Sequence, residues 1–346
     1  MIRIGILGAA KIAPPAVIVP ARKRDDCRVV CVAARDGARA RAYAAEHAIP
    51  ESLGSYDALI AHPDIDLIYN ALPPHRHAEL TIAALEAGKA VLCEKPFAMN
   101  AREASAMTAA SARAARPLVE AFHYRFHPVF ENILAAVRGG AIGRLCAIKS
   151  EFSVAIRYRP GELRHDPALG GGALMDLGCY ALHWARTVAG SEPVVTRAES
   201  KLSPHGVDLV TTADLTFDGG ATAQVRASMA PGQTFKALLA IQGSEGRLVA
   251  HNPLHPHRGH SISIHTKKGV QRYTVPGQTT YDHQLAHMLD VMKTNVPPFT
   301  GGADSVANMV LIDAVYAAAG VRRPSPIQAA ARAIPIRSPA SSSSGT

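Results

Sequence analysis

The sequence has few cysteines and no apolar run long enough to cross a membrane. Its five cysteines in 346 residues form no CxxC pair, and they are Cys27, Cys31, Cys93, Cys146 and Cys179. This spacing argues against a disulfide framework or a cysteine zinc site, so we expect reduced, mostly buried thiols. No apolar stretch reaches the roughly 20 residues of a membrane span, and Met1 to Gly8 lacks the features of a signal peptide. We therefore expect a cytoplasmic protein without membrane contact.

A basic block is also absent, although the formal net charge is +9. The arginines are scattered, and no stretch interleaves aromatic with basic residues as nucleic-acid-binding proteins do. We therefore expect no nucleic-acid partner, and the charge suits an anionic small molecule such as a phosphorylated cofactor. The hydrophobic fraction of 48% is typical of a globular protein. The length predicts two domains of roughly 150 residues each.

The first third of the chain alternates between apolar strands and helical stretches. The predicted strands are residues 2–7, 28–33, 66–71, 89–93 and 117–121, and the predicted helices are 39–47, 56–61, 77–87 and 101–115. Strands that alternate with helices indicate βαβ units and a parallel sheet. The class is therefore α/β, with an N-terminal Rossmann domain, a doubly wound parallel sheet, at residues 1–122.

After residue 145 the pattern changes to a succession of strands. These are residues 145–156, 194–202, 207–217, 221–229 and 235–242, followed by helices at about 281–294 and 303–319. Such a run predicts a C-terminal α+β domain, residues 123–336, with a large, mostly antiparallel open sheet. Residues 337–346 are low in complexity, and we expect a disordered tail there.

The first predicted strand runs into a glycine turn that resembles a dinucleotide fingerprint. Counted from Gly8, the G-x-G-x-x-G pattern has alanine at its second and third glycine positions, Ala10 and Ala13. The first glycine permits a tight turn, and backbone N–H groups at the following helix start bind phosphate. We therefore expect Gly8, Ala10, Lys11 and Ile12 to contact a dinucleotide.

Two arginines follow the second predicted strand. Arg35 comes at the strand end, and Arg39 stands one helical turn later on the same face. An acidic residue at this place suits the ribose of NAD, whereas arginine suits the 2′-phosphate of NADP. The pair favours NADP(H), and Asp36, which can face the ribose instead, keeps NAD(H) open. Solvent-exposed arginines at a helix start are the alternative.

Further motifs give the chain a family resemblance. The motifs are Gly5 to Ala13, Asn70 to His77, Glu94-Lys95-Pro96, Glu120 to Pro128, and Gly170 to Tyr180. Through them the chain resembles the glucose-fructose oxidoreductase / inositol dehydrogenase (Gfo/Idh/MocA) family over about residues 1–330, and most of all the branch of dimeric dihydrodiol dehydrogenases and NADP-dependent D-xylose dehydrogenases. The resemblance implies a Rossmann domain followed by an α/β domain whose open sheet forms a homodimer or tetramer interface.

The same resemblance implies the catalytic residues Lys95, Asp176 and Tyr180. Hydride transfer needs a proton donor or acceptor at the substrate oxygen, and a lysine ammonium near a phenol is expected to lower the phenol pKa from about 10. Asp176 precedes Tyr180 by four residues, so both share one face if the segment is helical. The carboxylate then orients Lys95 or binds a substrate hydroxyl. The alternatives to a catalytic role are that Tyr180 is a core residue and that Lys95 only belongs to a turn.

The chain departs from the family pattern at two positions. Many members have histidine where Tyr180 stands and aspartate where His183 stands. Tyrosine fits the dihydrodiol and xylose branch, whereas the missing aspartate puts an inositol-type substrate in doubt. His183 either contacts substrate together with Lys95, Asp176 and Tyr180, or is a structural histidine.

The resemblance also implies weaker cofactor contacts, with packing or exposed surface as the alternative for each. These residues are Leu72, Pro73, His75, His77, Glu94, Lys95, His123, Arg125, Arg164 and Tyr281. The five histidines between His251 and His265 could suggest a metal site, because imidazole binds zinc, copper and nickel. Pro253 and Pro256 prevent the helix that would align them, so we expect a surface loop and no metal.

The sequence as a whole predicts an NADP(H)-dependent oxidoreductase that acts on a carbinol or carbonyl carbon of a sugar, cyclic polyol or related ring. Tyr180 would be the acid/base, assisted by Lys95. A non-catalytic NAD(P)-sensing regulator and an NAD-dependent glycosidase of the same fold are the alternatives. The substrate and the direction of hydride transfer stay open.

Overall fold

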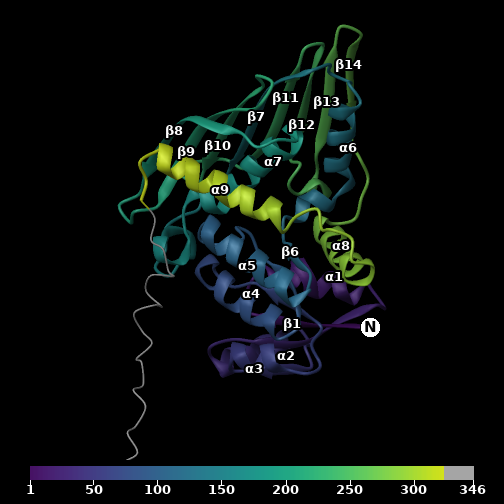
Figure 1. Cartoon of the computed structure of the whole chain (residues 1–346), viewed down its shortest axis with the longest axis vertical. Coiled ribbons are helices and arrows are strands. Elements are labelled where there is room, and N and C mark those ends of the chain that lie inside the picture. Colours follow the sequence, from purple (N-terminus) through teal and green to yellow (C-terminus); the bar gives the residue numbers. More distant parts are fainter. Residues whose placement is uncertain (323–346) are drawn as a thin grey trace, which may run out of the picture.

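The computed structural model describes residues 1–322, which form two sheets with helices packed against them (Figure 1). The predicted tail at 337–346 and the end of the predicted second domain lie outside the described residues. The boundary predicted at 122/123 falls just after the last strand of the first sheet, at Glu120. Within residues 1–322, no helix is long and apolar enough to cross a membrane.

The first sheet is parallel throughout, as the alternating pattern predicts. Its strands are β1 (Ile2–Leu7), β2 (Cys27–Ala33), β3 (Glu51–Leu53), β4 (Leu67–Asn70), β5 (Ala90–Cys93) and β6 (Leu118–Glu120). They lie in the order β3-β2-β1-β4-β5-β6. The order changes direction between β1 and β4, and ligands of doubly wound sheets bind at the carboxyl ends of the strands beside such a point.

Helices cover both faces of this sheet. The N-terminal part supplies α1 (Val19–Arg22), α2 (Gly37–Glu46), α3 (Tyr56–Ala61), α4 (His77–Glu86) and α5 (Ala101–Ala114). Near the end of the chain, α8 (Thr280–Thr294) returns and packs Leu285 and Met288 into the same core as Ile4 and Leu92. Its start is fixed by a capping box, in which Thr279 and Asp282 bond each other's backbone N–H groups. The first sheet therefore depends on a helix from the second part of the sequence.

The second sheet has eight strands and is mostly antiparallel, as predicted. The strands are β7 (Leu145–Ser153), β8 (Val194–Leu202), β9 (Asp208–Thr216), β10 (Thr222–Ser228), β11 (Lys236–Gly243), β12 (Gly246–His251), β13 (Ser261–Thr266) and β14 (Gly269–Tyr273). Their order is β14-β13-β12-β11-β7-β10-β9-β8, and only β10 and β7 run parallel.

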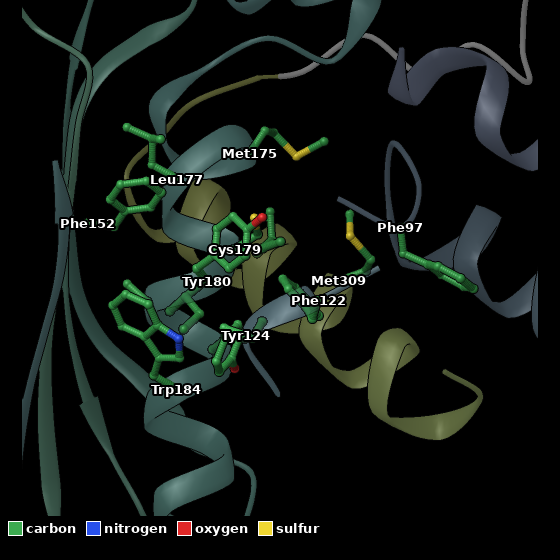
Figure 2. Packing of buried hydrophobic residues seen from close by; sticks show 14 of the residues in the cluster. Phe97, Phe122, Tyr124, Phe152, Met175, Leu177, Cys179, Tyr180, Trp184 and Met309 are labelled. Atoms are coloured by element: carbon green, nitrogen blue, oxygen red, sulfur yellow. The ribbon is translucent and has the colours of Figure 1, made fainter. Parts of the chain in front are cut away.

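Helices lie across one face of the second sheet, as Figure 1 shows for α7 (Cys179–Ala189) and α9 (Ala303–Ala318). A π-helical turn, η6 (Leu174–Gly178), leads directly into α7. The interior under these helices is rich in aromatic rings, and Figure 2 shows Tyr124, Phe152, Tyr180 and Trp184 gathered there. This core holds the helix start that carries Asp176 and Tyr180.

Several elements escaped the sequence patterns. The short strand β3, the strands β12 to β14 and the helix α6 (Pro128–Arg138) were not predicted. In α6, His127 caps the first turn by accepting a hydrogen bond from Val129 N, and Pro128 takes the first helical position. The predicted surface loop at His251 to His265 instead contains the end of β12, a loop and most of β13.

Candidate active site

The first functional cluster joins the end of β5 to the π-helical turn η6. Lys95 Nζ donates to Asp176 Oδ1 at 2.7 Å and to the Asp176 carbonyl at 2.8 Å. Arg164 Nε donates to the second carboxylate oxygen, Oδ2, at 2.8 Å. The structure thus brings Lys95 and Asp176 together, and places Arg164 on that carboxylate. Both side chains of the Lys95–Asp176 pair are 15% exposed.

The charges of this pair stabilise each other. Burial opposes the charged form of Asp176, but Lys95 and Arg164 lower the pKa of its carboxyl to about 2. Burial likewise opposes the charged form of Lys95, and the Asp176 carboxylate nevertheless raises the pKa of the ammonium. At neutral pH the site therefore contains a fixed ammonium whose position is set by a carboxylate and a guanidinium.

Tyr180 lies beside this pair with its ring toward the ammonium. Lys95 Nζ is 5.0 Å from the Tyr180 ring centroid, which is cation–π range. The ring packs edge-on against Phe122 at 5.3 Å and Phe152 at 5.8 Å, and only 4% of the residue is exposed. Among the described residues the Tyr180 hydroxyl has no hydrogen-bond partner. It is therefore available to a ligand.

The predicted lowering of the Tyr180 pKa is wrong. Burial raises the pKa of the phenol well above its ordinary value, and the negative charge of Glu94 acts in the same direction. Lys95 does not reverse this, because its ammonium faces the ring and is paired with Asp176. Tyr180 is therefore a neutral phenol that can donate a proton.

Glu94 lies next to Lys95 and is 8% exposed. Its Oε1 accepts a 2.5 Å hydrogen bond from the Tyr69 hydroxyl, which comes from β4. Burial raises the pKa of the Glu94 carboxyl. Glu94 thus links the carboxyl ends of β4 and β5 next to Lys95.

The rings of His123, Tyr281 and His255 form a cluster next to Tyr180, called the aromatic wall below. The ring of His123 lies 5.8 Å from Tyr180, 4.6 Å from Tyr281 and 4.8 Å from His255. Its Nδ1 is bonded to Thr280 Oγ1 at 2.9 Å, and burial lowers the pKa of His123 well below its ordinary value. Four neutral rings from different elements, those of Tyr180, His123, Tyr281 and His255, therefore gather near Lys95.

The glycine turn after β1 fits a dinucleotide pyrophosphate. Gly8 adopts φ +100°, a conformation that favours glycine, and a Cβ there would meet Leu72 Cδ2 at 2.9 Å. The N–H groups of Lys11 and Ile12 have no hydrogen-bond partner among the described residues, and they precede the helical turn η1 (Pro14–Ile18). Such N–H groups suit an anion. Arg39 and Tyr43 bond the carbonyls of Ala9 and Ala10 at 3.0 and 2.9 Å, and so hold the turn from α2.

The residues after β2 divide into a cap and an exposed cation. Asp36 caps α2, and its Oδ1 accepts a hydrogen bond from Ala38 N at 2.9 Å. Arg35 is exposed. Arg39 is also exposed, but it donates from Nη2 to the turn, so the two arginines predicted as a pair have different neighbours. Arg35 has no hydrogen bond or ion pair with the described residues.

The loop after β4 is fastened to the Lys95 turn by a buried histidine. His77 Nε2 lies 2.6 Å from the Leu72 carbonyl oxygen and Nδ1 lies 3.0 Å from that of Pro96, and the neutral ring donates its one N–H to one of them. Burial lowers the pKa of His77 to about 4. Pro73 continues this loop, and His75 in it is half-buried, with an Nδ1 that has no partner among the described residues. His77 therefore positions the loop through its contacts.

Comparisons with known proteins agree with these two halves. Residues 2–122 match the profile described as "Oxidoreductase family, NAD-binding Rossmann fold" (GFO/IDH/MocA), and residues 130–249 match the GFO/IDH/MocA C-terminal domain. The chain belongs to this family. The GFO/IDH/MocA resemblance found in the motifs is thereby confirmed.

Relatives within the GFO/IDH/MocA family lie in the expected branch. A D-xylose 1-dehydrogenase (NADP(+)) of Haloferax volcanii is 35% identical over 91% of this chain and 96% of its own. A trans-1,2-dihydrobenzene-1,2-diol dehydrogenase of Xenopus tropicalis is 36% identical over 70% of this chain and 73% of its own.

Solved structures share the fold over nearly the whole chain. A 3-ketoreductase from Actinomadura kijaniata with NADP and TDP-benzene matches with a TM-score of 0.85 and 25% identity, over 92% of this chain and 97% of its own. An aldose-aldose oxidoreductase from Caulobacter crescentus with glycerol gives 0.84 and 26%, with the same two coverages. This GFO/IDH/MocA protein is thus an NAD(P)-dependent oxidoreductase.

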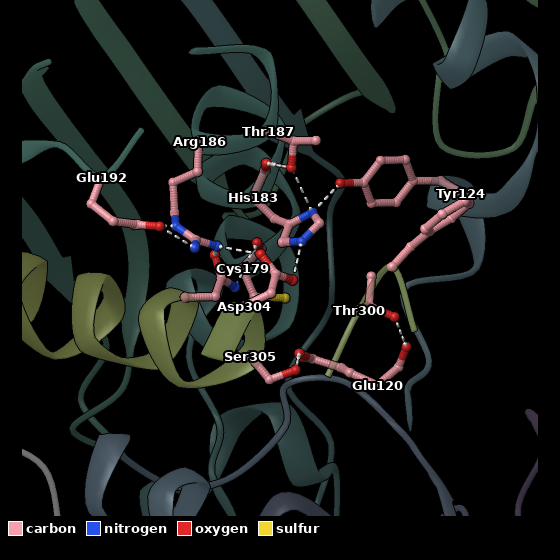
Figure 3. Close-up of polar contacts among 12 residues, drawn as sticks. Glu120, Tyr124, Cys179, His183, Arg186, Thr187, Glu192, Thr300, Asp304 and Ser305 are labelled. Atoms are coloured by element: carbon pink, nitrogen blue, oxygen red, sulfur yellow. Dashed lines mark hydrogen bonds and ion pairs between the residues drawn. The ribbon is translucent and has the colours of Figure 1, made fainter. Parts of the chain in front are cut away.

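Three predicted ligand contacts have partners within the protein. Arg125 pairs with Glu131 and stacks on Phe299 at 4.7 Å. His183 is 1% exposed, with Nδ1 bonded to Tyr124 and Nε2 to Asp304 at 2.8 Å (Figure 3). Both ring nitrogens are occupied, so His183 offers none to a substrate. Arg164, predicted at the cofactor, binds Asp176, and its contact with a cofactor stays a prediction.

Two pocket residues were missed. Tyr69 lies in an apolar strand segment that gave no signal. His255 was assigned to a surface loop, although its ring stacks on His123. Only the contact between distant segments reveals either residue. No group of three or more His, Cys, Asp or Glu among residues 1–322 is arranged to hold a metal ion.

Proposed function

We propose that this protein transfers hydride between NADP(H) and a carbinol or carbonyl carbon of a sugar or related ring, with Tyr180 as acid/base and Lys95 as its assisting cation. The observation that carries the proposal is the unpartnered Tyr180 hydroxyl beside the Lys95–Asp176 pair, whose Nζ–Oδ1 distance is 2.7 Å. This pocket lies at the carboxyl edge of a parallel sheet, where doubly wound folds bind ligands.

The nicotinamide, when bound, would supply or accept the hydride. In reduction, the neutral Tyr180 phenol donates its proton to the substrate oxygen as the carbonyl carbon becomes a carbinol. The Lys95 ammonium stabilises the negative charge that develops on that oxygen or on the phenolate. Asp176 and Arg164 hold the ammonium in place, since Asp176 accepts from both at 2.7 and 2.8 Å. In oxidation the same proton returns to Tyr180.

The substrate class is inferred from relatives and from the pocket walls. The relatives are named for D-xylose and for a dihydrodiol ring, both of which carry hydroxyls on a compact skeleton. The rings of Tyr180, His123 and Tyr281 present flat faces and edges that pack against the C–H groups of such a skeleton. An inositol-type substrate is disfavoured, because His183 replaces the aspartate expected for it and is bonded within the core.

The preference for NADP(H) is inferred from the edge after β2. Asp36 is engaged as the cap of α2, and Arg35 is the exposed cation beside it. A guanidinium suits a 2′-phosphate, whereas the carboxylate that would bind the NAD ribose is already in use. We place the pyrophosphate on the N–H groups of Lys11 and Ile12, and the nicotinamide near His123 and Tyr281.

The experiment that tests the function is a turnover panel with the purified protein. Pentoses, hexoses, keto-sugars, anhydro-sugars and trans-dihydrodiols are offered with NADP(H) and NAD(H) in both directions, and absorbance of the reduced nicotinamide is followed. Turnover of one substrate group with preference for NADP(H) supports the proposal. Tight cofactor binding with no turnover would favour the regulatory alternative. An aryl glycoside is added to the panel, and release of its aglycone would favour the glycosidase.

Tyr180→Phe tests the acid/base role. The ring contacts with Phe122 and Phe152 remain, so folding and cofactor binding should be kept, whereas kcat should fall by about 10²- to 10⁴-fold because the proton donor is lost. Steady-state kinetics and a fluorescence titration with NADPH measure the two effects. Tyr158→Phe, at an exposed tyrosine, is the matched control. Unchanged turnover in Tyr180→Phe would sink the assignment.

A further inference from the structure

The loop between β12 and β13 lies against the aromatic wall of the pocket. His255, near its middle, stacks on His123 with ring centroids 4.8 Å apart and an interplanar angle of 14°. It also lies 6.2 Å from Tyr281 and close enough to Lys95 for the ammonium to affect its titration. A side chain from the second sheet thus reaches the end of the first, next to the pocket of Tyr180.

The loop is held in shape by its own polar contacts. Asn252 has φ +51°, and its Oδ1 accepts from His255 N at 3.0 Å while its Nδ2 donates to the carbonyls of His255 at 2.9 Å and Gly259 at 2.7 Å. His260 Nδ1 is bonded to the Pro256 carbonyl, and its Nε2 accepts from Val275 N, both at 2.9 Å. The position of His255 is therefore set before any ligand arrives.

The two ring nitrogens of His255 are not used by the protein. Its Nδ1 is enclosed, and neither Nδ1 nor Nε2 has a hydrogen-bond partner among the described residues. Burial, with the charges of Arg258 and Lys95, lowers the pKa of His255 to about 4, so the ring is neutral at neutral pH. An enclosed N–H without an acceptor is costly, so the proton belongs on Nε2. The Nε2–H of His255 is therefore a neutral hydrogen-bond donor, held in place by its loop, next to the rings of His123 and Tyr281.

We propose that His255 is a specificity-determining residue, whose Nε2–H donates a hydrogen bond to a hydroxyl oxygen of the ring substrate away from the reacting carbon. This inference rests on the proposed function. The nicotinamide carboxamide oxygen has the same acceptor chemistry, and the experiment separates the two sources. A pocket built to bond a hydroxyl rejects analogues that lack it, so His255 would select polyhydroxylated rings over deoxygenated ones.

The test uses His255→Phe, which keeps a flat ring to stack on His123 but has no N–H. We expect KM for the sugar found in the panel to rise about ten-fold with little change in kcat, since removal of one positioned donor usually costs about that factor. The dissociation constant for NADPH should stay within about two-fold of the wild type. His255→Gln, which restores a donor, should recover part of the loss. His251→Phe, at the exposed end of β12, should behave as wild type.

Three outcomes would overturn the inference: an unchanged KM in His255→Phe, no recovery in His255→Gln, or a loss confined to NADPH affinity, which would assign the donor to the carboxamide. Failure of the proposed function is recognised separately by the absence of wild-type turnover. In that case, calorimetric titration of D-xylose into NADPH-loaded protein decides. Weaker D-xylose binding by His255→Phe supports the inference, and equal or absent binding in both proteins refutes it.

Discussion

At Lys95 and Asp176, burial and ion pairing act on the pKa values in opposite directions. Burial disfavours both charges, but their contact, joined by Arg164, lowers the carboxyl pKa of Asp176 to about 2. Tyr180 lacks such a partner, so burial, with nearby groups such as Glu94 acting in the same direction, raises its pKa. The site therefore keeps Lys95 and Asp176 charged and Tyr180 neutral, and the neutral phenol is the group that can give a proton.

In the proposed function, Arg35 is the residue that selects NADP(H) over NAD(H). Replacing it with alanine should weaken NADPH binding by about ten-fold or more, because a charge-assisted contact to the 2′-phosphate is lost. Binding of NADH should change little, because NADH has no 2′-phosphate. Fluorescence titrations with both cofactors measure the ratio. Arg28→Ala, an exposed arginine near the opposite end of β2, is the control, and equal losses for the two cofactors in Arg35→Ala would contradict the NADP(H) assignment.

Contacts between side chains could be predicted from the sequence only where the motif also sets the place of each residue in a strand or helix. Lys95 follows a buried strand, and Asp176 precedes Tyr180 on a helical segment, so their approach could be expected. Arg125 and His183 stand in equally suggestive motifs, yet their partners are Glu131 and Asp304, which lie in helices whose position the sequence does not give. Polar side chains such as these bond the groups that lie nearest to them. Which groups lie nearest depends on how elements far apart in the chain pack together.

At the scale of secondary-structure elements, hydrogen bonds at the end of β6 connect the first sheet to the segment that begins α9. Glu120 N donates to the Thr300 carbonyl at 3.3 Å, and Thr300 Oγ1 donates to the Glu120 carbonyl at 2.6 Å. Ser305, in the first turn of α9, donates to Glu120 Oε2 at 2.6 Å (Figure 3). Because Glu120 is 1% exposed, this junction excludes water. The position of α9 over the second sheet is thus tied to the first.

Glu120 should make stability depend on pH. Burial raises its pKa in the folded protein to about 8, from 4.5 in the unfolded chain. The folded state therefore holds a proton that the unfolded state has lost, and the free energy of unfolding falls as the pH rises from about 4.5 to about 8. Glu120→Gln keeps an acceptor for Ser305 and does not titrate, so its stability should fall less across this range.

Urea unfolding at several pH values between 5 and 8 measures the difference. The exposed Glu79 provides the control, since Glu79→Gln should keep the wild-type slope. A Glu120→Gln protein whose stability declines with pH as steeply as that of the wild type would show that Glu120 is ionised in the folded state.

Local patterns predicted the long elements better than the short ones. β8 matches its predicted range of 194–202, and β7, β9, β10 and β11 end within a few residues of theirs, because apolar alternation and glycine turns mark them. The strands β12 to β14 were missed, since histidines, prolines and lysines interrupt the alternation there. Their ends are fixed by pairing of β12 with β11, of β13 with β12 and of β14 with β13, and these pairings are tertiary contacts. The loop that carries His255 belongs to this missed region. The sequence therefore did not predict that His255 lies close to His123 and Tyr281.

At the scale of the whole molecule, helices from residues 1–322 cover one face of the second sheet, and no helix of these residues covers the other face. Cross-strand rows on the open face alternate in charge and polarity, as in the row Lys149–Gln224–Asp214–Arg197. A shallow groove there is lined by Lys149, Asp214 and Gln224, together with Arg247. Rows of mixed charge are self-complementary when two copies meet around a two-fold axis. We propose that this face joins protomers into a dimer or tetramer.

Light scattering on a size-exclusion column tests this directly. The wild type should elute with a mass of two or four chains of 36.5 kDa. Gln224→Arg adds a second positive charge beside Lys149 at the centre of the row, so repulsion and bulk across the interface should shift the mass toward one chain. Lys267→Glu, in the exposed turn between β13 and β14, should leave the mass unchanged.

Because the pocket of Tyr180 lies on the helix-covered side, the monomeric variant should keep its turnover. A wild type that elutes as one chain, or a Gln224→Arg protein that keeps the full assembly, would show that the open face does not join the protomers.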